Sequence, residues 1–168
     1  MGMLGWLMIQ TPGGKLCAQP PSSEMLKVIK CHDFDINGKG TDPEWAKTSW
    51  YPLTRLDSAG INYSTRFKIL YAEKGIYVLF DGEDNRISTA FNQDFQDLYN
   101  ADVFEVFFKP DTSMKLSLEY ELTELHNELV LLILNLTGKA SRWLPFHYNM
   151  KSVQKKVDRV GGQADTGA

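Results

Sequence analysis

The sequence predicts an all-β protein, an antiparallel β-sandwich with only short helical turns. From about residue 62 onward, one segment of strand-forming residues follows another, and glycine, proline, aspartate and asparagine separate the segments. One of these segments, residues 128–135, contains a continuous apolar run and predicts a strand buried on both faces. Helical patterns are confined to short stretches, so the spacing of strands and turns favours two antiparallel sheets.

The first part of the folded region combines a strand, a turn and a short helix. Residues 27–36 alternate between apolar and polar side chains, which predicts a strand. A short helix is expected to begin just after Thr41, because Asp42 can cap it and Pro43 suits its first position. Residues 67–80 then predict a hairpin with a tight turn in its middle.

Two further strands carry glutamates on one of their faces. In residues 102–109, Phe104, Val106 and Phe108 form one wholly apolar face, so Glu105 points to the other face, beside Val103 and Phe107. Residues 116–122 repeat this alternation, with leucine and tyrosine on one face and Glu119 and Glu121 on the opposite one. If the two strands are neighbours, three carboxylates gather on one side of a sheet.

The chain divides into a leader, one domain and a tail. Residues 1–25 are expected to be a leader or linker, either the remnant of a secretion signal or a segment without an export role. Residues 26–160 form the domain, and 161–168 a disordered tail. Cys17 and Cys31 can pair, but two cysteines fit either redox compartment. No apolar run reaches the length of about 18 residues that a membrane span needs.

The composition of the chain limits which classes of function it can have. The chain has 168 residues, enough for one ordinary domain. Its net charge of −3 argues against nucleic acid as a partner, because phosphate contacts need a basic surface. Aromatic residues make up 12%, which fits binding of flat apolar ligand faces and equally fits a large β core.

Four segments in order carry a resemblance to a known family. They are GKGTDPEW at 38–45, FKILYAEKGIYVLFDGE at 67–83, LYNADVFEVFFK at 98–109 and LEYELTELHN at 118–127. Together they resemble the family 9 carbohydrate-binding modules, in the family 9-like branch, over about residues 33–157. The most specific part is the spacing of Tyr99, Asp102 and Glu105.

The resemblance implies a DOMON-like β-sandwich that binds the ends of glycan chains without catalysis. It also implies a secreted, periplasmic or cell-surface protein of bacterial type that supports glycoside hydrolases in the breakdown of plant polysaccharides. By motif, Tyr99 stands where the family has its first stacking ring, and Glu105 and Glu121 where it has polar sugar contacts. The family pattern continues past the end of this chain, so the sandwich is expected to lack C-terminal strands and the domain to be incomplete.

The residues themselves suit a sugar site, because sugars offer hydroxyl edges to carboxylates and C–H faces to aromatic rings. We expect Glu105, Glu119 and Glu121 on an exposed sheet face, with Arg66 offsetting their charge. Rings from nearby loops complete the expected site, namely Tyr99, Trp50 and Trp143. The alternative is that these glutamates are ordinary solvent-facing strand residues and that the tryptophans pack under loops.

No cofactor is expected, apart from a structural calcium. Asp81 and Asp84 lie in an acidic loop, and Asp102 precedes a strand, so their oxygens suit a hard cation. The alternatives are an exposed loop without an ion and, for Asp102, a turn cap.

Two other functions remain open from the residues. A glycoside hydrolase would use Glu105 with Glu119 or Glu121, held about 5 Å or about 6.5–9.5 Å apart across a cleft. A haem-binding DOMON-like domain would need an axial methionine and histidine pair. The candidates for that pair are Met114, Met150, His126 and His147. The resemblance favours carbohydrate binding over both.

Overall fold

The structure, a computed structural model, describes residues 25–54, 63–84, 90–135, 142–145 and 153–158. Within these ranges the chain forms eight strands in two four-stranded sheets and two short 3₁₀ helices. The all-β class is therefore confirmed, and the two sheets are consistent with a sandwich. The first sheet belongs to one compact unit, which also includes residues 154–158, and the second sheet belongs to another.

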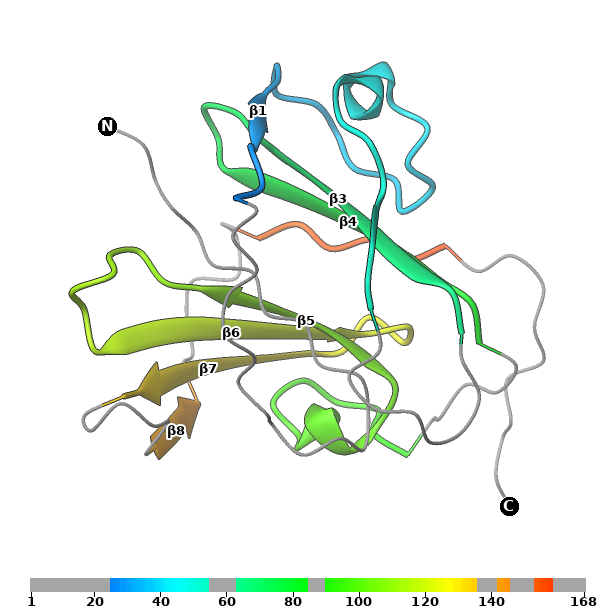
Figure 1. Ribbon diagram of the computed structural model, residues 1–168. Coiled ribbons are helices and arrows are strands. Elements are labelled where there is room, and N and C mark those ends of the chain that lie inside the picture. The colour runs from blue at the N-terminus through cyan, green and yellow to red at the C-terminus, as the bar shows by residue number, and fades with distance from the viewer. Residues whose placement is uncertain (1–24, 55–62, 85–89, 136–141, 146–152, 159–168) are drawn as a thin grey trace. The chain divides into compact units, whose positions relative to one another are not determined.

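The first sheet is organised around β3 (Thr65–Tyr71). On one edge it pairs antiparallel with β4 (Ile76–Gly82) along its whole length, which confirms the predicted hairpin (Figure 1). On its other edge, β2 (Tyr51–Pro52) pairs antiparallel and β1 (Ile29–Lys30) pairs parallel, each over two residues.

The strand predicted over residues 27–36 is much shorter in the structure, because the chain leaves the sheet at Cys31 to pack across the hairpin. The Phe34 ring stacks on Tyr77 with 4.4 Å between ring centroids, and it meets Trp45 edge-on at 5.3 Å. Cys31, Trp45 and Leu70 form the buried centre of this unit. Cys17, which could form a disulfide with Cys31, lies outside the described residues.

The predicted turn and helix follow this segment. The helix is η1 (Pro43–Lys47), and its first turn is capped by the Asp42 carboxylate, which accepts a hydrogen bond from the Glu44 N–H at 2.9 Å. Gly38, in the turn, has a φ of +77°, and a Cβ there would lie 2.9 Å from the Val157 carbonyl carbon. Glycine is required at this position because a side chain would collide with backbone.

The second sheet is an antiparallel meander of β5 (Val103–Phe108), β6 (Leu116–Thr123), β7 (Glu128–Leu134) and β8 (Arg142–Pro145) (Figure 1). The first three confirm the predicted strands, and β7 is largely buried along its length. The fourth corrects the interpretation of Trp143 as a loop residue, because its backbone pairs with Ile133. Pro145 is compatible with β8 because β8 is an edge strand, where a missing N–H is tolerated.

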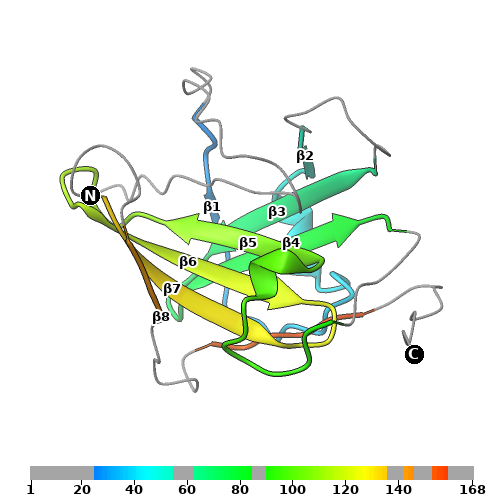
Figure 2. The same ribbon diagram turned by 90° about the horizontal axis from the view of Figure 1, so that it is seen from below.

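The two faces of the second sheet carry different side chains, as the sequence alternation predicts. The register places Glu105 opposite Glu121, so the glutamates of β5 and β6 share one face. That face also carries Leu129 and Leu131 of β7, which pack against Leu98 of the short helix η2 (Leu98–Asn100). Figure 2 shows η2, the green coil, beside β5 and β6. The glutamates therefore lie on the face that bears this unit's buried apolar cluster.

Candidate functional site

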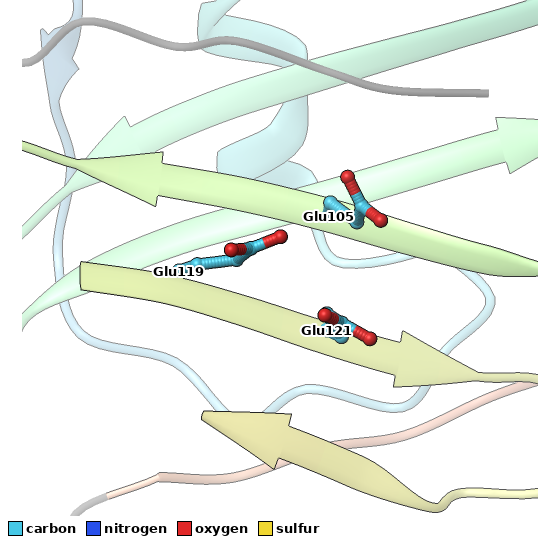
Figure 3. Close-up of side chains that lie close together, drawn as sticks. All are labelled: Glu105, Glu119 and Glu121. Atoms are coloured by element: carbon cyan, nitrogen blue, oxygen red, sulfur yellow. The ribbon is translucent and has the colours of Figure 1, made fainter. Parts of the chain in front are cut away.

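Three glutamates from adjacent strands form the centre of the candidate site. Glu105 on β5 is the direct cross-strand partner of Glu121 on β6, and Glu119 lies two residues earlier on β6 (Figure 3). One carboxylate oxygen from each residue lies within 4.8 Å of the others. The predicted gathering of the three carboxylates on one sheet face is therefore confirmed. Their role in binding a ligand remains a prediction.

The expected exposure of these glutamates is wrong. Glu105 is 3%, Glu119 4% and Glu121 0% exposed. Strand alternation places them on the face opposite Phe104 and Phe108 of β5, but it does not say which face is covered. In the structure the glutamate face is also the face on which Leu98, Leu129 and the neighbouring apolar residues pack.

Four carboxylate oxygens of this cluster have no hydrogen-bond donor within the described part of the chain. Both oxygens of Glu121, and the Oε2 atoms of Glu105 and Glu119, are buried without a hydrogen-bond partner in the described part of the chain. The Tyr99 backbone N–H favours the charged form of Glu121 slightly, without reaching hydrogen-bonding geometry. Buried charges ordinarily need pairing or a metal ion, so this arrangement is energetically costly as it stands.

Electrostatics within the cluster follow from this burial. The pKa of Glu105 rises to about 8, chiefly through desolvation and then through the negative charge of Glu119. Desolvation alone raises the pKa of Glu119 to about 7. The pKa of Glu121 rises to about 9, chiefly through desolvation and then through the charges of Glu119, Glu105 and Asp97. The cluster therefore resists full ionisation near neutral pH.

Tyr99 combines exposure with closeness to the cluster. Its side chain is 47% exposed, although it sits on η2, whose Leu98 is fully buried. Desolvation, followed by the charges of Asp97 and Glu121, raises the pKa of the Tyr99 hydroxyl. An aromatic ring is thus presented to solvent near Glu121 of the acidic cluster, and its role as a stacking ring for sugar stays a prediction.

Asp97 is the member of this region that the sequence reasoning missed. It is exposed, it occupies the position before η2, and its charge acts on both Tyr99 and Glu121. The available signal was its spacing, two residues before Tyr99. That spacing alone does not show that the chain turns back toward β6.

Trp50 and Arg66 lie in the unit of the first sheet and contact each other there. The Arg66 guanidinium carbon is 4.5 Å from the centroid of the Trp50 ring, and the Lys68 Nζ is 5.1 Å from it. The Arg66 guanidinium also pairs with the Asp81 carboxylate, at 2.6 and 2.8 Å. The ion pair that the structure gives Arg66 is therefore with Asp81, and an offset of the glutamates' charge by Arg66 stays a prediction.

The acidic residues predicted to hold calcium do not form a common ligand group among the described residues. Asp81 pairs with Arg66 across the β3–β4 register, Asp84 follows β4, and Asp102 precedes β5. The group of possible metal ligands that the described residues do form is Glu105, Glu119 and Glu121. The Trp143 side chain lies outside the described residues, as do Met150 and His147 of the haem alternative.

Two largely antiparallel sheets with almost no helix make this an all-β domain. Among known families, residues 36–129 match the one described as "Carbohydrate family 9 binding domain-like". Because the match covers more than half of the chain, the protein belongs to this family, and the resemblance is confirmed. Membership supports carbohydrate binding as the general function. Comparisons with curated proteins and with solved structures gave no match.

One further finding concerns membranes. Among the described residues, none of the helices has the length and apolar character needed to cross a bilayer.

Proposed function

We propose that the protein is a non-catalytic module that binds the ends of plant-type oligosaccharide or polysaccharide chains through a platform at Tyr99. The observation that carries this proposal is the half-exposed Tyr99 ring on η2, next to an acidic cluster. Family membership supports a sugar as the ligand class. The sugar's C–H face would stack on the ring, and its hydroxyl groups would donate to the exposed Asp97 carboxylate.

Burial argues that the three glutamates do not touch sugar directly. A ligand in solvent cannot reach carboxylates that are 0–4% exposed without displacing the residues that cover them. The same burial favours binding over hydrolysis, because a glycosidase needs its two carboxyl groups on either side of the bond that it cleaves. We therefore propose that Glu105, Glu119 and Glu121 lie in the buried layer beneath the Tyr99 ring and do not contact the sugar.

The proposed ligand also suggests where the protein works. Polysaccharides are degraded outside the cell, so a module that binds their chain ends would act as a secreted, periplasmic or cell-surface protein. Its partner would be a glycoside hydrolase acting on the same polymer in a carbohydrate catabolic process.

Calorimetric titration with xylo- and cello-oligosaccharides tests the proposal. The Tyr99→Ala variant should bind about 1–3 kcal/mol more weakly than the wild type, the usual cost of removing an aromatic anchor. Tyr71→Ala is the matched control, since Tyr71 is exposed to 42% but lies on β3 of the other unit. If the folded Tyr99→Ala variant binds with the same affinity as the wild type, Tyr99 is not part of the sugar site. Release of reducing sugar would contradict the non-catalytic assignment.

A further inference from the structure

Two independent observations converge on the glutamate cluster of β5 and β6. The first is proximity, because Glu105, Glu119 and Glu121 each bring a carboxylate oxygen within 4.8 Å of the other two (Figure 3). Like charges directly opposite one another in a sheet are destabilising. Glu105 and Glu121 are such a pair, so proximity alone gives no reason for the cluster to be stable.

The second observation is that four of the buried carboxylate oxygens have no hydrogen-bond partner in the ranges that the structure describes. Glu121 is fully buried, it faces the other two glutamates, and neither of its oxygens has a hydrogen-bond partner among the described residues. Glu128 in the same sheet provides the contrast. It is 1% exposed, yet its carboxylate accepts a 2.7 Å hydrogen bond from the Tyr120 hydroxyl. This sheet can therefore satisfy a buried glutamate with a protein donor, and at the cluster it does not.

We propose that Glu105, Glu119 and Glu121 bind a hard divalent cation of the Ca²⁺ class, as a structural site separate from sugar binding. A cation would replace the missing donors and convert the repulsion between the carboxylates into attraction. It would tie β5 to β6, beneath the helix η2 that presents Tyr99.

The donor set selects the class of cation. Three carboxylates supply up to six hard oxygen ligands, and Ca²⁺ takes six to eight oxygens in flexible geometry. Mg²⁺ demands near-ideal octahedral geometry and keeps several of its waters, which a site this buried does not favour. The cluster contains neither cysteine nor histidine, so zinc and copper lack their preferred ligands.

The experiment uses the full 168-residue chain, freed of metal by a chelator and then titrated with CaCl₂. Calorimetry should give one Ca²⁺ per chain. Saturating Ca²⁺ should raise the thermal midpoint by about 4 °C or more, as expected for a ligand that binds only the folded state. Mg²⁺ should bind at least about tenfold more weakly because of its retained hydration shell. No sugar is present, so this test can fail or succeed independently of the proposed sugar platform.

Variants locate the site. Glu119→Gln and Glu121→Gln keep the side-chain shape and remove a charge, so both should fold without metal and lose at least about tenfold in Ca²⁺ affinity. Glu128→Gln is the matched control, a buried glutamate of the same sheet on the opposite face, and should keep the wild-type Ca²⁺ affinity. Tyr99→Ala should also keep it.

Three results would overturn the proposal. The first is a wild-type chain whose melting does not respond to Ca²⁺. The second is a Ca²⁺ response that survives in both Glu119→Gln and Glu121→Gln. The third is an equal loss of affinity in Glu128→Gln, which would indicate a non-specific effect of removing acidic charge.

Discussion

Replacing Glu119 by glutamine should stabilise the metal-free protein at alkaline pH and leave its stability at acidic pH almost unchanged. Glu119 is 4% exposed, and burial alone raises its pKa from 4.5 to about 7. Its charge also raises the pKa values of Glu105 and Glu121. Glutamine has nearly the same shape but no charge, so the substitution isolates the electrostatic cost.

The sign follows from linkage between protonation and folding. A carboxyl whose pKa is raised in the folded state costs nothing below its unfolded pKa, where it is protonated in both states. The cost appears as the pH rises above 4.5 and is complete once the pH exceeds the folded pKa of about 7. At about 1.4 kcal/mol per pKa unit, the rise corresponds to a stability loss of about 3 kcal/mol.

Urea unfolding at pH 5 and pH 8, in the presence of a chelator, measures this difference. The free energy of unfolding of Glu119→Gln should exceed that of the wild type by about 3 kcal/mol at pH 8 and by much less at pH 5. Glu73→Gln is the control, because Glu73 is exposed and its ion pair with Lys30 contributes little. The reasoning is refuted if the two proteins differ equally at both pH values, or if Glu119→Gln is the less stable one at pH 8.

Two further substitutions test the packing around the site and the turn that precedes η1. Leu98→Ala should lower the free energy of unfolding by about 2–5 kcal/mol, because Leu98 is fully buried against Leu129 and Leu131; urea denaturation with a loss below about 1 kcal/mol would contradict this packing. Gly38→Ala should destabilise by at least about 1 kcal/mol, since it combines a positive φ with a collision at the Val157 backbone. A thermal midpoint equal to that of the wild type would show that this turn tolerates a side chain.

Much of the local structure was readable from the sequence. Alternation along β5 and β6 placed Glu105 and Glu119 on the face opposite Phe104 and Phe108, because side-chain direction in a strand repeats every two residues. The cap at Asp42 and the hairpin between β3 and β4 were predicted for the same reason, since each depends on residues close together in the chain. The spacing around Tyr99 also carried the family assignment.

Other features required the tertiary structure. The partner of Arg66 depends on strand register, which sets it opposite Asp81 in the hairpin, and no local pattern of charges reveals this pairing. Residues 27–36 alternate like a strand, yet only Ile29–Lys30 pair, because Phe34 is instead drawn into stacking on Tyr77. Trp143 joins β8 through a backbone pairing with Ile133 that its own sequence does not specify.

The sequence by itself determined the all-β class, the family and the sharing of one sheet face by three acidic side chains. Only the tertiary structure decided that this face is covered, and therefore that carboxylates expected in solvent are 0–4% exposed. The physical reason is that alternation depends on neighbouring residues alone. Burial depends on which distant residues pack against the face, here Leu98 together with Leu129 and Leu131.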